Sequence, residues 1–377
     1  MVAAADAAFA ADLYGRVAAS PGNVVVSPSS VEAVLQMATI GARGATAVQL
    51  RHVLHLADRS DAQIVTAAAA VRQSTLDLTD ASAGGELRIS DRLWLDRVFA
   101  ASATFVDELR AGWGSPPDRL DFHGDSDAAR RDINAAVASE TNGKITGLLA
   151  PDAVDSNTKF MLTDAVYLDA DWAAKFNVSS TMPGPFTTAD GQSKMTPLMH
   201  QTTQLGYVRG AGFQTVQLAY AGDRLVMTIV LPDAALAPVE QQLAARGLAS
   251  FTAGVRPTEV ALTLPRFHAP ATSALRAPLT ALGMTEPFGP AADFGGIATG
   301  GGLSLTAAVQ SAAVTVDEDG TQAVAATALG GGTSAIQVPP PARVTVTVDR
   351  PFLFVISDVR SGVPIFLGRI DDPSATA

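Results

Sequence analysis

The sequence predicts a single domain of mixed α+β class, and three observations lead to that prediction. Helical patterns dominate the chain before Lys159, whereas strand patterns dominate after it. The chain has 377 residues, 47% of them hydrophobic, which is enough to bury a large core. No segment repeats with a period of about 20–50 residues, which excludes a solenoid. The glycine runs at 300–302 and 330–332 fall between strands and mark loops rather than domain linkers.

The helical part begins near the first residues, where Phe9, Leu13 and Val17 recur at spacings of four. A second helix is expected to run through Ile40, with Ser29 or Ser30 able to cap its start. Further helices are predicted at Ala45–Leu56, Asp61–Leu76, Ala103–Ala111 and Asp127–Thr141, and one early strand at Leu87–Asp96.

The strand-rich part begins with Lys159–Trp172, which is long and apolar enough for the interior of a sheet. A hairpin is expected across Gly222-Asp223. The other strands are predicted at Thr258–Phe267, Ala307–Glu318, Ala342–Asp349, Pro351–Asp358 and Pro364–Ile370, with helices at Ala234–Gly247 and Ala271–Gly283.

Composition excludes several classes of function. The net charge is −11 and lysines and arginines do not cluster, which argues against nucleic acid, heparin-like polyanions and anionic membranes as partners. The chain has no cysteine, so disulfides, thiolate catalysis and cysteine-bound zinc are excluded. No apolar run approaches the roughly 18 residues of a membrane span. The first residues lack the pattern of a signal peptide, so either the protein is intracellular or a leader was removed.

Motifs of known catalytic sites are absent from the sequence. It has no G-x-S-x-G, no Walker A loop, no G-x-G-x-x-G and no H-E-x-x-H. His52 and His55 could share a helix face, but no third ligand stands near them. The acidic run Asp317–Asp319 is interpreted as a solvated strand end rather than a cation site, although Glu318 is given a separate role below. We therefore expect no enzyme activity, no cofactor and no metal.

The segment between Asp319 and Arg343 is unusual because it contains no charged and no aromatic residue. Loops longer than about 12–15 residues without secondary structure are uncommon and are usually functional or disordered. A flexible linker is the alternative, but a linker does not normally precede an internal strand of a sheet. We interpret the segment as a functional loop.

Eight sequence strings together resemble the serpin family, the large inhibitors of serine proteases. They are NVVVSPSSVEAVLQMATIGARGATAVQL from Asn23, INAAVASETNGKITGLL from Ile133, FMLTDAVYLDADWAAKF from Phe160, KMTPLM, LPRF, LGMTEPF, ADFGGI and DRPFLFVISDVRSGVPIFLGRI from Asp349. They stand in family order and cover nearly the whole chain, although Ala136 replaces a usual tryptophan. The resemblance implies one serpin domain over 1–377, with three β-sheets, about eight or nine helices and an exposed reactive-centre loop at about 318–341.

The resemblance also implies a mechanism, in which a protease cleaves the loop and the loop then inserts into the large sheet as a new strand. The hinge of this loop comprises Glu318, Gly320, Thr321, Ala323, Ala325, Ala326 and Thr327. In a strand, Thr321, Ala323, Ala325 and Thr327 share one face and are all small, so that face can be buried. Non-inhibitory serpins with a binding, storage or chaperone role are the alternative, and they usually carry proline, charge or bulky residues in the hinge.

Two further groups of residues are implied by the resemblance. The breach, at the top of the large sheet, contains Trp172 and Arg266, with Arg266 opposite Glu318. The shutter, behind the strands that open, contains Ser27, Ser30, Asp164 and Gln310. Asp164 and Gln310 replace an asparagine and a histidine that are usual in the family, so they form either a substitute hydrogen-bond network or a gap filled by water.

The family's usual span from Glu318 predicts cleavage at Ser334–Ala335. Alignment backward from the following strand instead moves the bond to Gln337–Val338, with Ile336 between the two positions. Small side chains before the bond suit elastase-like or subtilisin-like proteases, since trypsin-like pockets need a cation and chymotrypsin-like pockets a large ring. The protein is expected to be a monomer that can form loop–sheet polymers.

Overall fold

The structure is a computed structural model that describes residues 2–78, 85–321 and 343–375. Its helices are α1 (Val2–Val17), α2 (Pro28–Gly41), α3 (Gly44–Val53), α4 (Asp61–Leu78), α5 (Ala103–Trp113), α6 (Ser126–Glu140), α7 (Ala237–Arg246), α8 (Ala249–Thr252) and α9 (Arg276–Ala281). The described residues thus contain nine α-helices, in agreement with the prediction. No helix in this part of the chain is both long and apolar enough to cross a membrane.

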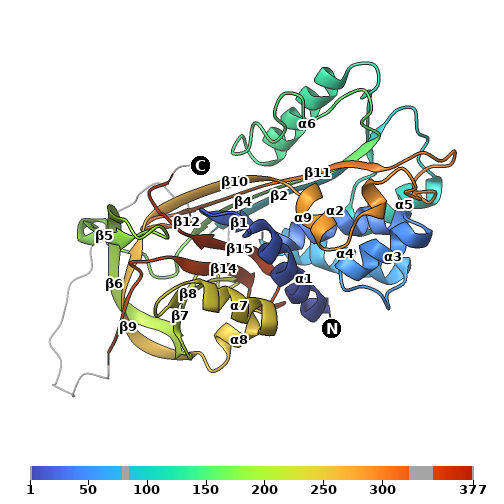
Figure 1. The fold of residues 1–377 in the computed structure, drawn as a ribbon. Helices are drawn as coiled ribbons and strands as arrows, with labels where there is room; N and C mark the ends of the chain where they lie inside the picture. Colours follow the sequence, from blue (N-terminus) through green and yellow to red (C-terminus); the bar gives the residue numbers. More distant parts are fainter. Residues whose placement is uncertain (1, 79–84, 322–342, 376–377) are drawn as a thin grey trace.

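A six-stranded sheet runs along one side of the molecule (Figure 1). We call it the large sheet, because it corresponds to the large sheet that the family resemblance implies. Its strands follow the order β10 (Phe267–Ala274), β11 (Leu305–Val316), β4 (Phe160–Asp171), β2 (Gly85–Asp96) and β3 (Asp118–Leu120), and β12 (Gly320–Thr321) pairs with β4. The pairs β4–β11 and β2–β3 are parallel, whereas β2 is antiparallel to β4 and β10 is antiparallel to β11.

The other nine strands form a second hydrogen-bonded network. They are β1 (Val24–Val26), β5 (Met182–Thr187), β6 (Ser193–Arg209), β7 (Phe213–Ala219), β8 (Leu225–Pro232), β9 (Arg256–Pro265), β13 (Val344–Thr347), β14 (Phe352–Asp358) and β15 (Pro364–Ile370). Strand β6 pairs with β5 at one end, with β9 along its middle and with β7 at the other end. Because β6 is continuous, two of the three expected sheets are joined in one network in the described residues. The α+β class is confirmed.

Both faces of the large sheet are covered. A core of aromatic and aliphatic side chains, including Trp172, Met227 and Phe354, lies between the two networks. A second core packs α2, α3 and α5 beneath the lower part of the large sheet, where Phe160 meets Phe294 edge to face at 4.8 Å. Helix α6 covers the outer face and contributes Ile133 and Val137 to a third core. Figure 1 shows α6 above the sheet and the other helices below it.

Two local predictions were wrong. The helix predicted at Ala271–Gly283 starts only at Arg276, because Phe267–Ala274 pairs along its whole length with β11. Tertiary pairing here overrides the helical propensity of alanine, and Pro270 is tolerated because β10 is an edge strand. Neither Ser29 nor Ser30 caps α2, since the helix starts at Pro28 with Ser27 before it.

Candidate functional site

The centre of the large sheet is a parallel pair that is closed along most of its length. Pairing between β11 and β4 runs from Leu305 opposite Phe160 to Ala313 opposite Tyr167 and ends there. Above that point β11 continues to Val316 beside β10, while β4 continues to Asp171. We call the space between β4 and β11 the slot, so the slot is closed below Tyr167 and open above it.

The open end of the slot is occupied by the first residues of the predicted hinge. Strand β12 pairs antiparallel with β4, placing Gly320 opposite Asp171 and Thr321 opposite Ala170. The other edge of Ala170 already pairs with Gly85 of β2, so β12 must lie on the edge that faces β11. The chain therefore leaves β11, turns, and re-enters the sheet between β11 and β4.

Both residues of β12 fit this position tightly. A Cβ atom at Gly320 would lie 2.0 Å from the carbonyl oxygen of Ala170, so only glycine can approach β4 this closely. Thr321 is fully buried, and its hydroxyl oxygen lies 2.7 Å from the hydroxyl of Tyr220. Tyr220 in turn stacks on Trp172 with ring centroids 4.5 Å apart. The side chain of Thr321 thus points into the core between the two networks.

The turn before β12 is held by its own acidic residues. The carboxylate of Asp317 accepts hydrogen bonds from the backbone N–H groups of Asp319 at 3.0 Å and Gly320 at 3.2 Å. The indole N–H of Trp172 donates to the carbonyl of Asp317 at 3.0 Å. Lys175 pairs with Asp319 at 3.1 Å. Asp317 and Asp319, interpreted as a solvated strand end, are partly buried and engaged in the turn, whereas Glu318, which the resemblance placed opposite Arg266, is 3% exposed.

The structure brings Glu318 and Arg266 together at this end of the slot. Arg266 donates from Nε to Oε1 of Glu318 at 2.8 Å, and its Nη2 and the hydroxyl of Thr181 donate to the same oxygen. Both nitrogens of Arg266 bond to the same carboxylate oxygen, so the pair is not bidentate across the two oxygens of Glu318. Burial acts to raise the pKa of Glu318, but the hydrogen bonds from Arg266 and Thr181 outweigh it and lower the pKa below its usual value.

The four predicted shutter residues also form one cluster, at the closed part of the slot. The amide nitrogen of Gln310 donates to Oδ2 of Asp164 and, at 2.9 Å, to the carbonyl of Ser27. The N–H of Ser27 donates back to Oε1 of Gln310 at 3.1 Å, and the hydroxyls of Ser27 and Ser30 lie 3.1 Å apart. Gln310 and Asp164 are in direct contact, so no water separates them.

Sequence reasoning missed one member of this cluster. Asp91 of β2 lies opposite Asp164 in the antiparallel register, so two aspartates face each other inside a sheet. Burial, followed by the charge of Asp164, raises the pKa of Asp91 well above its usual value. Burial raises the pKa of Asp164 to about 7, although hydrogen bonds from Gln310 and Asp91 act in the opposite direction. An aspartate in the interior of each strand was the available signal, but only the register shows that the two face each other.

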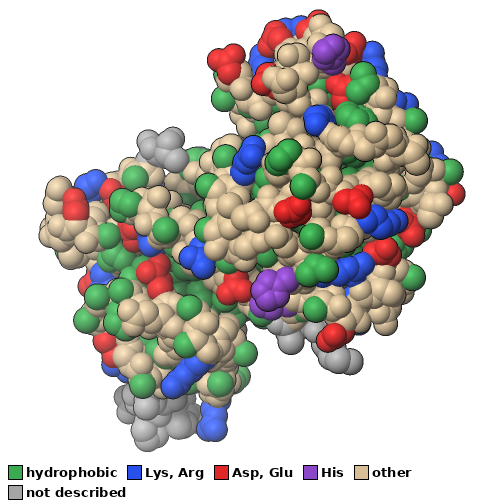
Figure 2. Space-filling model, turned by 45° about the vertical axis from the view of Figure 1, so that its right-hand side comes forward, with side chains coloured by type: hydrophobic (Ala, Val, Ile, Leu, Met, Phe, Trp, Pro, Cys, Tyr) green, Lys and Arg blue, Asp and Glu red, His purple; other side chains and the backbone are tan. Residues whose placement is uncertain are grey.

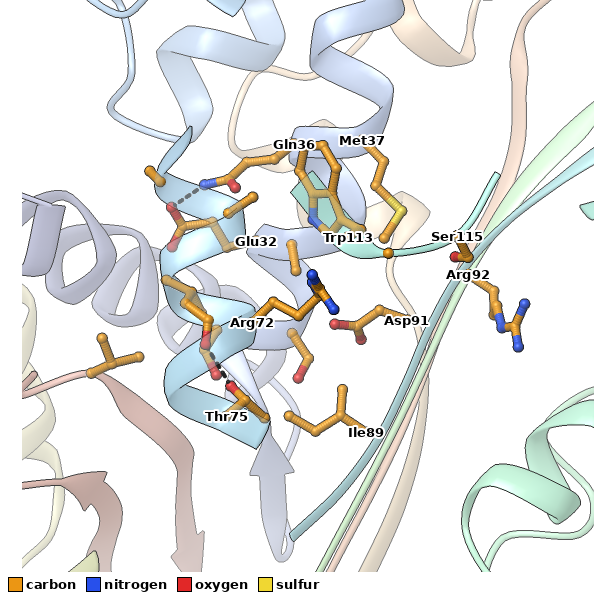
Figure 3. Close-up of a pocket in the computed structure, with 18 of the residues that line it drawn as sticks. Glu32, Gln36, Met37, Arg72, Thr75, Ile89, Asp91, Arg92, Trp113 and Ser115 are labelled. Carbon is orange, nitrogen blue, oxygen red and sulfur yellow. Dashed lines mark hydrogen bonds between the residues drawn. The ribbon is translucent and has the colours of Figure 1, made fainter. Parts of the chain in front are cut away.

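Asp91 also lines a cavity of about 400 Å³ between α2, α4, β2 and the end of α5 (Figure 3). Arg72 of α4 extends toward Asp91 in this view, and Glu32 lies near the other end, where Gln36 donates a hydrogen bond to it at 2.8 Å. In the described residues no group of three or more histidine, aspartate or glutamate side chains could hold a metal ion. On the face shown in Figure 2, acidic and basic side chains are interspersed.

The rest of the predicted site lies outside the described residues. This concerns the hinge residues Ala323, Ala325, Ala326 and Thr327 and the candidate reactive-bond residues Ser334, Ala335, Ile336, Gln337 and Val338.

Comparison with known proteins extends over the whole chain. Residues 4–373 match the sequence profile of a family described as "Serpin (serine protease inhibitor)". The leukocyte elastase inhibitor of Sus scrofa is 32% identical over 384 residues, covering 99% of this chain and 99% of that protein. An uncharacterized serpin-like protein of Thermococcus kodakarensis is 32% identical over 367 residues, covering 97% of this chain and 84% of that protein. The crystal structure of Serpin48, described as a highly specific serpin in the insect Tenebrio molitor, matches with a TM-score of 0.86 at 25% identity, covering 98% of each chain.

Proposed function

The chain belongs to the serpin family and has its fold, and we propose that it traps a serine protease by inserting its cleaved loop into the slot. Membership of the family supports protease inhibition in general. In the proposed mechanism the protease attacks the loop after β12 and forms an acyl-enzyme at its own serine. The freed loop then inserts between β4 and β11 and carries the attached protease with it. The inhibitor contributes no catalytic group.

The observation that supports this mechanism most is the position of β12. Gly320 and Thr321 pair with β4 on the edge that faces β11, so the proposed inserted strand already has its first two residues and its register. Continuing this antiparallel register brings Ala323 opposite Leu168 and Ala325 opposite Val166. Leu168 and Val166 are 1% and 0% exposed, so the new side chains on this face must be small.

The same register also limits the size of the side chains on the other face of the inserted strand, which lies toward α6. Ala326 comes opposite Ala165, which is fully buried in the core beneath α6. Gln322 comes opposite Asp169, which is only partly buried. Small residues are therefore needed on both faces near the middle of the inserted strand, whereas a polar residue is acceptable near its start.

The register also brings Thr327 opposite Asp164. Since Gln310 pairs with Asp164 across the closed slot, an inserted strand must separate these two residues. A threonine hydroxyl both donates and accepts, so Thr327 can donate to Asp164 and accept from the amide of Gln310. Insertion then replaces the broken hydrogen bond rather than leaving two buried polar groups without partners.

The free energy for trapping comes from the new strand. Insertion replaces one parallel ladder by two antiparallel ones, which are slightly more stable per residue. A strand of about fifteen residues adds roughly that many hydrogen bonds at ~1 kcal/mol net each, so the gain is on the order of 10–20 kcal/mol. This is comparable with the stability of a whole domain, and it is enough to distort a trapped protease.

We assign the target to elastase-like or subtilisin-like proteases, with cleavage after Ser334. The loop offers neither a cation nor an aromatic ring between Asp319 and Arg343, and small residues suit shallow or tolerant pockets. The name of the porcine relative, leukocyte elastase inhibitor, agrees with this assignment. The working species is proposed to be a monomer.

The test is incubation with elastase and with subtilisin, followed by denaturing gel electrophoresis and mass spectrometry of the released peptide. We expect a complex that resists SDS and a peptide that begins at Ala335. Replacement Ser334→Arg should transfer complex formation to trypsin. Clean cleavage of the parent without any complex would show a non-inhibitory member of the family, and a parent that traps trypsin faster than elastase would contradict the assigned target.

A further inference from the structure

Two aspartates face each other across β2 and β4 at the closed part of the slot. Asp91 and Asp164 are directly opposite in the antiparallel register, and Asp164 is fully buried. Their neighbours along the two strands on the same face, such as Leu93, Leu162 and Val166, are apolar and buried. Two ionised carboxylates in such surroundings are strongly unfavourable, because Asp164 loses its hydration, Asp91 loses part of it, and the two charges repel each other.

The hydrogen bonds of the pair show how this conflict is resolved. Gln310 donates to Oδ2 of Asp164, but Oδ1 of Asp91 and Oδ1 of Asp164 are buried and have no donor among the described residues. An ionised carboxylate can only accept, whereas a protonated one also donates. The two groups therefore satisfy each other only when one of them holds a proton and shares it with its neighbour.

Nearby charges do not replace that proton. Arg92, the next residue on β2, points to the opposite face, where it pairs with Asp118 at 2.8 Å and with Glu140 of α6. On the cavity side the titratable groups that line the space with Asp91 are Arg72 of α4, Glu32 of α2 and Asp6 of α1, together with the ion pair of Arg92 and Glu140 (Figure 3). Burial raises the pKa of Asp6 to about 6 and that of Glu32 well above its usual value. The surroundings thus add more acidic groups than cations.

We propose that Asp164 is a proton-dependent latch between β4 and β11, and that Asp91 is a positioning residue that sets the pH at which the latch weakens. This inference rests on the loop insertion proposed above. The bond from Gln310 to Asp164 joins the two strands that must separate. A hydrogen bond to an ionised carboxylate is roughly twice as strong as one between neutral groups. Protonation of Asp164 therefore weakens the latch.

The direction of the pH effect on insertion follows from this. The pKa of about 7 for Asp164 places its ionisation in the neutral range. Opening of the slot breaks the bond from Gln310, which favours the ionised form, while the entering strand keeps Asp164 buried, so the opened state binds a proton more tightly than the closed one. The rate of insertion should fall as the pH rises through about 7, by no more than about tenfold per pH unit for one proton.

Global unfolding should respond to the same proton, and this response is a separate check. In the unfolded chain an aspartate ionises near pH 3.9, and the folded-state pKa values of Asp91 and Asp164 are raised. The contribution of the pair to stability is therefore complete below about pH 4 and is lost as the pH rises through the folded-state values.

The experiment measures insertion of a synthetic peptide with the sequence of residues 321–333 into the intact, uncleaved protein between pH 5.5 and 8.5. Incorporation is followed on native gels and by the rise in thermal stability. We expect the parent rate to fall by roughly tenfold between pH 6 and pH 8, within the limit for one proton. Asp164→Asn should give a flat profile, since an amide does not titrate. Asp91→Ala should shift the midpoint to higher pH, because Asp164 then loses the hydrogen bond from Asp91 that lowers its pKa.

The control is Asp107→Asn, a change of an exposed aspartate on α5 rather than on a strand of the slot, which should keep the parent profile. If the peptide fails to insert at any pH, the proposed loop insertion is wrong and the latch fails with it. If the peptide inserts but Asp164→Asn keeps the pH dependence of the parent, the latch alone is overturned. Should Asp164→Asn fail to fold, an unshifted midpoint in Asp91→Ala overturns the latch on its own.

Discussion

At the open end of the slot, Glu318 accepts hydrogen bonds from Arg266 and Thr181, and these lower its pKa below the usual value despite burial. At the closed part, Asp164 meets the amide of Gln310 and the carboxyl group of Asp91, and burial raises its pKa to about 7. One buried carboxylate is thus held ionised by a cation, whereas the other lacks a cation and depends on a proton.

This difference means that the two ends of the slot respond differently to pH. The contribution of Glu318 to stability is present above its unfolded-state pKa and is lost only as the pH falls through its lowered folded-state value. The protonation state of Glu318 at the open end is therefore constant across the neutral pH range, whereas Asp164 at the closed part gains or loses its proton in that range. A strand that inserts from Thr321 first passes the pair of Glu318 and Arg266, which does not depend on pH in the neutral range. It then has to break the contact of Gln310 with Asp164, whose strength depends on the protonation of Asp164.

The largest effect is expected from Ala325→Arg, which lets the strand pass the open end but stops it before Asp164. In the register of β12, residue 325 comes opposite the fully buried Val166. An unpaired charge at such a place costs several kcal/mol, so insertion should become slower than release of the protease. The gel assay should show cleaved protein in place of the stable complex.

Gln322→Arg is the matched control for that prediction. It introduces the same side chain three residues earlier, opposite the partly buried Asp169, and it should retain most of the complex. Equal loss of trapping in both variants would show that arginine disturbs the loop before insertion, and would remove the support for the register.

A smaller effect is expected at the shutter from Asp164→Ala and Gln310→Ala, measured by guanidinium unfolding at pH 6. Each change leaves a buried partner without its hydrogen bond and should cost about 1–3 kcal/mol. Because the two side chains bond to each other, the double variant should lose less than the sum of the single losses, by about 1 kcal/mol. Strictly additive losses would mean that the contact does not contribute as a pair.

The sequence predicted the fold class well because long periodic segments determine it. The apolar run at β4 and the hairpin of β7 and β8 were predicted because each has a local pattern that needs no partner. The second half of β10, from Ala271 to Ala274, was predicted as a helix because alanine favours a helix, and only its pairing with β11 determines the outcome.

The candidate site was predictable to the extent that the family resemblance located it. The resemblance pointed to Glu318 with Arg266 and to Asp164 with Gln310, and the structure places each pair in contact. It could not reveal Asp91, because facing residues on neighbouring strands are determined by register and not by spacing in the sequence.

The smallest effect is expected from Glu318→Lys, which acts only at the open end. Glu318 is 3% exposed, but the side chain of Arg266 is 41% exposed, so solvent screens their attraction and the pair contributes modestly, on the order of 1 kcal/mol. Lysine here faces Arg266 and should loosen the turn before β12, which leaves the entrance free for the loop of a second molecule. We expect faster polymerisation on gentle heating, seen as a ladder on native gels, while the pH dependence of peptide insertion keeps the parent midpoint, because Asp164 is unchanged. Glu318→Gln, which keeps an acceptor for Arg266, should polymerise at an intermediate rate. A shifted midpoint in Glu318→Lys would show that the two ends of the slot are coupled and do not act separately.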